Sequence, residues 1–169
     1  MRRPEIKEYA PYYEDYIKGV IGNDPFRNLA NQYQEIQSIL QSLPEEEANY
    51  AYSEGKWTVK EVLGHLIDNE RIMSYRALCI SRKEKQSLPG FEQDDYVKEA
   101  NFKERTITNL LDDYRTVRKS TINLFKNFSE SMLNQRGIAN GEEVTVLALL
   151  YIITGHEMHH LKILKEKYL

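Results

Sequence analysis

The residues best suited to chemistry in this sequence are its four histidines, which lie in two places. His65 stands alone, whereas His156, His159 and His160 lie close together near the C-terminus. Residues four apart share one face of an α-helix, about 6 Å apart, so His156 and His160 can direct their rings at a common point. Their neighbours on that face are apolar, and an imidazole that faces a core needs a partner for its nitrogen atoms. A metal ion is such a partner, with His65 as a third ligand.

The predicted ligand set of His65, His156 and His160 favours a catalytic site over a structural one. Three neutral imidazoles leave at least one position on a divalent ion open. Zinc and nickel both suit nitrogen ligands, so we expect one divalent ion of either kind. Such an ion lowers the pKa of a bound thiol or water, so that a thiolate or hydroxide is available near neutral pH. The alternative is that the histidines are hydrogen-bonded core groups that bind no metal.

Residues beside the histidines are further candidates. His159 points about 60° to one side of His156, so we expect it to be exposed or at the core boundary, with an anionic substrate as the alternative partner. Asp68, one turn after His65, could orient a ligand, act as a base or be an ordinary surface carboxylate. Glu157 is expected to point into solvent.

The segment from His156 to His160 also matches the HExxH motif of zinc proteases. Two observations disfavour that interpretation. Only nine residues follow His160, which leaves little room for a third downstream ligand. The expected solvent exposure of Glu157 also removes the general base that the motif requires.

Apolar residues at helical spacing place these candidates on two of four amphipathic helices. The helices are predicted over residues 25–43, 58 to about 81, about 106–128, and from about 145 almost to the C-terminus at Leu169. Thr58 and Glu61 form a capping box at the start of the second helix, and Trp57 precedes the cap. Since no segment has a convincing strand pattern, the predicted fold class is all-α, a four-helix bundle.

Two further segments complete the predicted bundle. Residues 1–22 form an aromatic-rich lead-in, whose tyrosines are expected to cover the helices. Residues 82–104 form a polar connection of roughly twenty residues, long enough to cross the length of the bundle. The second helix would then run parallel to the third and antiparallel to the fourth.

Size and composition narrow the function classes. A chain of 169 residues fits a single domain over residues 1–169. Its net charge of −3, with both signs interspersed, argues against a nucleic-acid binder. No apolar run approaches the roughly 20 residues of a membrane span, and the N-terminus has no signal-peptide pattern. The single cysteine, Cys79, lies too far along its helix from His65 to share a metal, so we expect it to pack in the core. Because one cysteine cannot form an internal disulfide, we expect the protein to be cytoplasmic.

Four stretches of the sequence together resemble the DinB-like superfamily. They are residues 57–68 (WTVKEVLGHLID), 88–91 (LPGF), 139–141 (ANG) and 155–160 (GHEMHH). The resemblance implies a four-helix bundle with up-down-down-up topology and a long crossover between the second and third helices. It also implies that His65, His156 and His160 are the metal ligands. Many members have glutamine three residues after the last ligand, where this chain has Ile163. We therefore do not expect the polar contact that this glutamine makes in other members.

The resemblance also indicates a reaction class. Known activities in the superfamily include transferases and an isomerase that use low-molecular-weight thiols, and other members are described as hydrolases or stress-induced proteins. We therefore expect a metal-dependent enzyme that activates a small thiol for S-transfer. A metal-dependent hydrolase is one alternative. A non-catalytic metal-binding stress-response protein is another, because no nucleophile or clear general base accompanies the histidines.

Catalytic residues and partners are less sharply defined. The polar connection could supply groups from Glu92, Asp94, Asp95 and Tyr96, although loop acids are usually solvated. No catalytic residue is assigned. The expected partners are a small-molecule substrate, with a low-molecular-weight thiol as a candidate, and a second copy of the chain in a homodimer.

Overall fold

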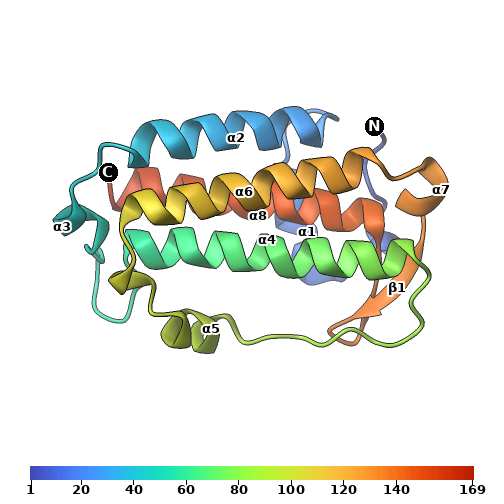
Figure 1. Ribbon diagram of the computed structural model, residues 1–169. Coiled ribbons are helices and arrows are strands. Elements are labelled where there is room, and N and C mark those ends of the chain that lie inside the picture. Colours follow the sequence, from blue (N-terminus) through green and yellow to red (C-terminus); the bar gives the residue numbers. More distant parts are fainter.

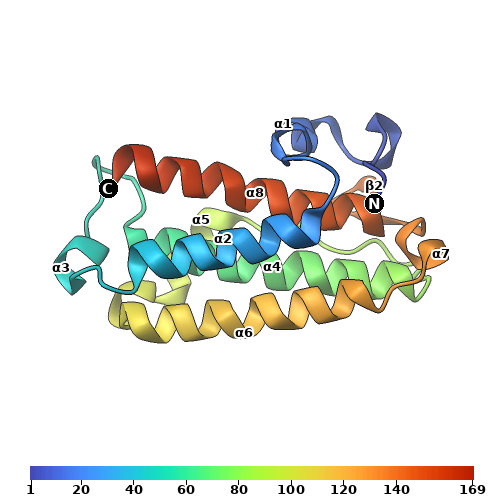
Figure 2. The same cartoon turned by 90° about the horizontal axis from the view of Figure 1, so that it is seen from above.

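The computed structural model describes residues 1–169 and contains the predicted bundle of four long helices, which lie alongside one another (Figures 1 and 2). They are α2 (Pro25–Leu40), α4 (Val59–Ser81), α6 (Ile107–Lys126) and α8 (Val146–Lys167). Each begins after a side chain that accepts a hydrogen bond from the first helical turn. These caps are Asp24, Thr58, Thr106 and Thr145. The predicted capping box of Thr58 and Glu61 is confirmed.

The four long helices run in two directions, which can be followed by colour in Figure 1. Residue pairs advance together along α4 and α6, so these two helices are parallel. The pairs are Glu70 with Arg118 and Ser74 with Thr121. Between α4 and α8 the order reverses, because Asn69 contacts His156 whereas the earlier His65 packs against the later His160.

Short elements fill the connections. α3 (Glu45–Ala48) follows α2, and α5 (Gln93–Ala100) with the 3-10 helix η3 (Phe102–Glu104) lies between α4 and α6. α7 (Glu130–Leu133) and the strands β1 (Arg136–Ala139) and β2 (Glu142–Thr145) lie between α6 and α8. The N-terminal lead-in folds into the 3-10 helices η1 (Ile6–Glu8) and η2 (Pro11–Tyr13), followed by α1 (Glu14–Gly19).

Three of the sequence expectations are wrong in detail. β1 and β2 form an antiparallel hairpin, although no strand was expected; four-residue strands are too short to show a clear alternation. Their turn has positive φ at Asn140 (55°) and Gly141 (78°), which suits a two-residue hairpin loop. The connection over residues 82–104 is not all loop, since it contains α5. The first helix ends at Leu40 instead of residue 43.

The N-terminal helix α1 packs on α8, as Figure 2 shows. Gly155 permits this close approach, because a Cβ atom there would lie 1.9 Å from the backbone oxygen of Tyr16. The contact brings the Tyr16 ring against His156, with centroids 5.4 Å apart. The expectation that lead-in tyrosines cover the bundle is confirmed for this residue.

The core consists of two apolar clusters with a polar layer between them. One cluster contains Met73 of α4 and Ile153 of α8, and the other contains Leu66 of α4 and Leu161 of α8. Buried polar side chains occupy the levels between these pairs: Gln32, Asn69, Glu70, Arg118, His156 and Glu157. None of the helices is long and apolar enough to cross a membrane. The fold thus places polar chemistry in the middle of the bundle.

Candidate metal centre

The structure brings the three predicted ligands together. One nitrogen from each of His65, His156 and His160 lies within 4.8 Å of the others. His65 and His156 face each other with their Nε2 atoms 3.0 Å apart. The His160 ring completes the cluster, with its centroid 5.0 Å from His65 and 4.6 Å from His156.

Burial keeps the three imidazoles neutral. It lowers the pKa of His65 to about 4. Burial, aided by the neighbouring histidines, lowers the pKa of His160 to about 3. The pKa of His156 lies well below its usual 6.5 for the same reasons. A neutral imidazole is the form that binds a metal ion, so the cluster is in its binding form at neutral pH.

The donor set fits a divalent ion. Two imidazole nitrogens bound tetrahedrally to one zinc ion at about 2.0–2.1 Å would lie about 3.3 Å apart. The Nε2 atoms of His65 and His156, at 3.0 Å, are close to that separation. The buried Nδ1 of His160 has no hydrogen-bond partner, a cost that a cluster evolved only for packing would avoid. Three imidazoles are typical ligands of zinc and of nickel.

Two neighbours hold the rings in place. The Trp57 side chain packs on His65 with centroids 4.7 Å apart and stacks over His160 at 6.4 Å. The amide Nδ2 of Asn69 lies 3.1 Å from Nδ1 of His156. Metal binding through Nε2 of His156 leaves a proton on Nδ1, which needs an acceptor. The Oδ1 atom of Asn69 can be this acceptor if the side-chain amide is flipped, so that Oδ1 instead of Nδ2 faces Nδ1 of His156.

Sequence reasoning did not identify these two neighbours as part of the site. Asn69 lies four residues after His65 and thus on the same face of α4, a spacing that could have revealed it. Trp57 was expected only to support the helix cap. Its place over two histidines depends on how α4 meets α8, which local spacing does not report.

The other candidates near the histidines lie outside the cluster. His159 is exposed, as expected, and its ring packs edge-on against His160 at 5.2 Å and Tyr16 at 5.5 Å. Asp68 forms an ion pair with Arg71 at 3.6 Å, and burial raises its pKa.

Two further sequence expectations concern apolar or weakly polar positions. Cys79 is partly buried against the apolar core, as expected. Ile163, where many superfamily members have glutamine, is partly buried and carries no polar group.

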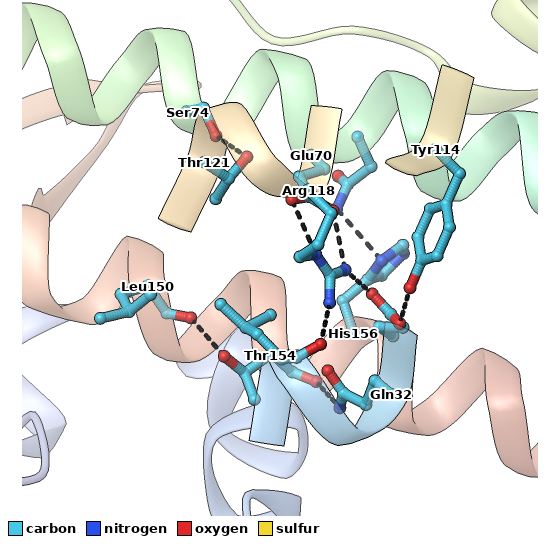
Figure 3. A network of polar contacts seen from close by, with 12 residues as sticks. Gln32, Glu70, Ser74, Tyr114, Arg118, Thr121, Leu150, Thr154 and His156 are labelled. Atoms are coloured by element: carbon cyan, nitrogen blue, oxygen red, sulfur yellow. Dashed lines mark hydrogen bonds and ion pairs between the residues drawn. The ribbon is translucent and has the colours of Figure 1, made fainter. Parts of the chain in front are cut away.

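The expectation for Glu157 is wrong. Its side chain is buried, accepts a hydrogen bond from the Tyr114 hydroxyl and pairs with Arg118. Figure 3 shows Arg118 at the centre of this network, with Glu70 and Tyr114 nearby. Arg118 also pairs with the buried Glu70 at 2.8 Å and donates to the backbone oxygen of Leu29. Two carboxylates therefore share one guanidinium. Glu157 is committed to this network, which removes it as the base of an HExxH site.

A cavity of about 520 Å³ opens beside the histidines. His156 and Asn69 line its buried end, and Tyr13 and Tyr16 form part of the wall. The rim includes Glu92 from the predicted polar connection, together with Glu142, Gln93 and Asn140. Asp94, Asp95 and Tyr96, the other polar candidates of that connection, do not line the cavity. Of the three clustered histidines only His156 lines the cavity, so a small molecule in this space can contact the cluster through His156.

Comparison with known families decides the membership of this chain. The DinB superfamily model matches residues 28–164, which include all four histidines. The chain belongs to the DinB superfamily. The resemblance seen in the sequence motifs is thereby confirmed.

The chain is also similar to a curated protein and to solved structures. A protein of Oceanobacillus iheyensis, named as a candidate metal-dependent hydrolase, is 25% identical over 134 residues, which cover 77% of this chain and 75% of the relative. YfiT from Bacillus subtilis, described as a candidate metal-dependent hydrolase with an unusual four-helix bundle topology, superposes with a TM-score of 0.75 at 15% identity. That match covers 95% of this chain and 92% of YfiT.

A mycothiol-dependent maleylpyruvate isomerase has the same type of bundle. The TM-score is 0.67 at 13% identity, and the match covers 82% of this chain and 58% of the isomerase. At such identities the likeness to solved structures concerns the fold. The family and the histidine geometry together support a metal-dependent function.

Proposed function

We propose that this protein is a metal-dependent enzyme that activates a low-molecular-weight thiol for S-transfer to an electrophile. In this proposal His65, His156 and His160 hold one divalent ion, either zinc or nickel. The observation that carries it is the convergence of three neutral imidazoles on one point beside a cavity of about 520 Å³. An ion held by three histidines would have at least one further coordination position for a substrate, and His156 lines the cavity through which a substrate would enter.

Residues around the histidines would limit the access of water and orient a ligand ring. When bound, the ion supplies the positive charge that lowers the pKa of a thiol and yields a thiolate near neutral pH. The rings of Trp57 and Tyr16 pack against the histidines and limit the access of water. Asn69 orients the His156 ring through Nδ1.

The distribution of carboxylates favours a thiol over water as the activated group. Hydrolysis commonly uses a general base near the nucleophilic water. The carboxylates that line the cavity, Glu92 and Glu142, are both exposed, and Glu157 is bound to Arg118. A thiol is acidic enough to ionise beside a cation without such a base. The similarity in fold to an isomerase described as mycothiol-dependent agrees with this choice.

Metal-assisted hydrolysis is the second candidate. The relative from Oceanobacillus iheyensis and YfiT are both described as candidate hydrolases of this kind. Under this alternative the same three histidines hold the ion, and Glu92, which lines the cavity, is a candidate base for water that enters it.

The proposal also covers the cellular compartment, the helix topology and the oligomeric state. A reducing cytoplasm would keep a small thiol cosubstrate available, and the single cysteine of the chain agrees with that compartment. We assign the bundle the up-down-down-up topology with a crossover between α4 and α6. The residue pairs of α4 with α6 and α8 support it. A homodimer remains a proposal, to be tested by light scattering.

One experiment separates the candidate functions. The purified protein is analysed for metal content, and the zinc- and nickel-loaded forms are assayed with several small thiols plus an aryl halide, and with an aryl ester. Thiol conjugation that is lost in His65→Ala and kept in His159→Ala supports the transferase. Ester cleavage without conjugation supports the hydrolase. A loaded protein that catalyses neither reaction overturns both and leaves a metal-binding protein without catalysis.

A further inference from the structure

The cavity beside His156 has two chemically different ends. The buried side chains of His156, Asn69 and Met73 form its inner end. The exposed side chains of Glu92 and Glu142 lie at its outer end. A ligand that fills the cavity therefore contacts the histidine cluster with one part and the rim with another.

The side chains that line the cavity include two carboxylates and no lysine or arginine. Glu92 and Glu142 are the carboxylates among the 15 lining residues, and none of the 15 is lysine or arginine. Neither carboxylate has an ion-pair partner in the protein. The nearest cation in the wall is Arg76, a buried side chain behind the lining residue Phe91, with its guanidinium carbon 5.9 Å from the ring centroid. It donates to the backbone oxygen of Pro89 at 2.6 Å, and the Phe91 ring separates it from the cavity. The rim is thus free to bind a cation from solution.

Three tyrosine rings line the cavity, and one of them packs against the histidine cluster. The Tyr12 ring lies edge-on to Tyr13 at 5.1 Å and to Tyr16 at 6.2 Å. Tyr16 in turn packs against His156 at 5.4 Å. Aromatic rings combined with carboxylates bind alkylammonium groups, through attraction to the ring face and through ion pairing. These three tyrosines line the same cavity as Glu92 and Glu142, and Tyr16 reaches the histidine cluster.

We propose that the cavity binds a small molecule with an ammonium group, which lies at the rim near Glu92 and Glu142. The thiol, carbonyl or other metal-binding group of that molecule faces His156. This assignment rests on the proposed metal-dependent function and adds a substrate class to it. About 520 Å³ suits a ligand of metabolite size, and this orientation keeps the ammonium group away from the divalent ion.

A series of three hydroxamates tests the proposal, because a hydroxamate binds zinc or nickel at an open position. The probes are hexanohydroxamate, 6-aminohexanohydroxamate and the monohydroxamate of adipic acid, which differ only in the group at the far end. Their affinities for the zinc-loaded protein are measured by calorimetry at low and high salt. Metal-free protein shows how much of the binding depends on the ion.

Two double variants with the same change in net charge provide the comparison. Glu92→Gln with Glu142→Gln removes the rim carboxylates. Asp94→Asn with Glu143→Gln removes carboxylates that lie one or two residues away and do not line the cavity. All four residues are exposed, and the one ion pair among them, Glu143 with Arg136 at 3.0 Å, lies on the surface and contributes about 0–1 kcal/mol, so both variants are expected to melt close to the natural protein.

The expected result is a ranking by terminal charge. The amino probe binds about fivefold more tightly than hexanohydroxamate, and the adipic probe binds most weakly, with differences that shrink at high salt. The ranking disappears in the Glu92/Glu142 variant and persists in the Asp94/Glu143 variant. Equal affinities for all three probes, or a ranking that survives in the Glu92/Glu142 variant, would overturn the ammonium assignment while leaving the open metal site intact. Absence of binding by all three would overturn the proposed function as well.

Discussion

The side-chain amide of Asn69 lies 3.1 Å from Nδ1 of His156, one helical turn after His65. This contact joins α4 to α8 at the level of the histidine cluster and fixes the orientation of the His156 ring. We expect Asn69→Ala to weaken metal binding about 10- to 100-fold, the usual effect of losing such a partner. Asn69→Asp should retain or exceed natural affinity, since a carboxylate accepts from Nδ1–H without turning over. Competition with a chromophoric chelator measures both. Equal affinities in Asn69→Ala and the natural protein would show that Asn69 does not support the ligand.

Metal stoichiometry tests the ligand set itself. One three-histidine cluster should bind about one divalent ion per chain. His65→Ala and His160→Ala should lower occupancy strongly, whereas His159→Ala, which removes an exposed ring outside the cluster, should leave it nearly unchanged. Elemental analysis after gel filtration provides the readout. Equal losses in all three variants would mean that the ligands are wrongly assigned.

The ligand set could be predicted because it depends on short-range rules. The spacing of His156 and His160 and the cap at Thr58 are local features, and they place the histidines at similar levels of the bundle. Glu157 could not be placed in this way. All residues of α8 from Val146 to Glu157 are buried, because α1, α2, α4 and β2 surround this half of the helix. A helix buried on all sides has no solvent face for periodicity to reveal.

The burial of Glu157 also depends on residues far away in the sequence. Its partner Arg118 lies on α6, and the second carboxylate of the network, Glu70, lies on α4. A single arginine and two glutamates separated by so many residues give no recognisable motif. The β1–β2 hairpin was missed for a different reason, since its strands have only four residues each.

The buried ion network should matter for stability. Arg118→Met leaves Glu70 and Glu157 buried without their cation, and breaking such a network costs about 3–5 kcal/mol in the free energy of unfolding. Arg115→Met is the matched control, because Arg115 pairs with Asp112 on the exposed face of the same helix. That pair should contribute only about 0–1 kcal/mol. Urea unfolding measures the free energy of unfolding of both variants. Similar decreases in the two would show that the buried network stabilises the fold no more than an exposed ion pair does.

The depressed histidine pKa values predict how the stability of the metal-free protein depends on pH. Below about 6.5 the unfolded chain binds a proton at each histidine. The folded protein does not bind one at His65 until about pH 4, or at His160 until about pH 3. The unfolded state therefore takes up more protons, so stability is full above about pH 6.5 and falls as the pH drops toward 4. The melting temperature of the metal-free protein should decrease over this window, and less steeply in His65→Leu. Identical slopes would contradict the assignment of the effect to the histidine cluster.

Removal of the metal should separate chemistry from folding. α2 and α6 supply no ligand, yet both pack into the apolar clusters, so the bundle should fold from hydrophobic burial alone. An ion that binds only the folded state still stabilises it, by about 2.7 kcal/mol at a free concentration one hundred times Kd. Chelation should therefore lower the melting temperature while circular dichroism at about 25 °C, the usual reference temperature, keeps its helical signal. Activity should disappear with the ion and return when zinc or nickel is added. Loss of helicity on chelation would instead make the site structural, as in zinc fingers, which unfold without metal.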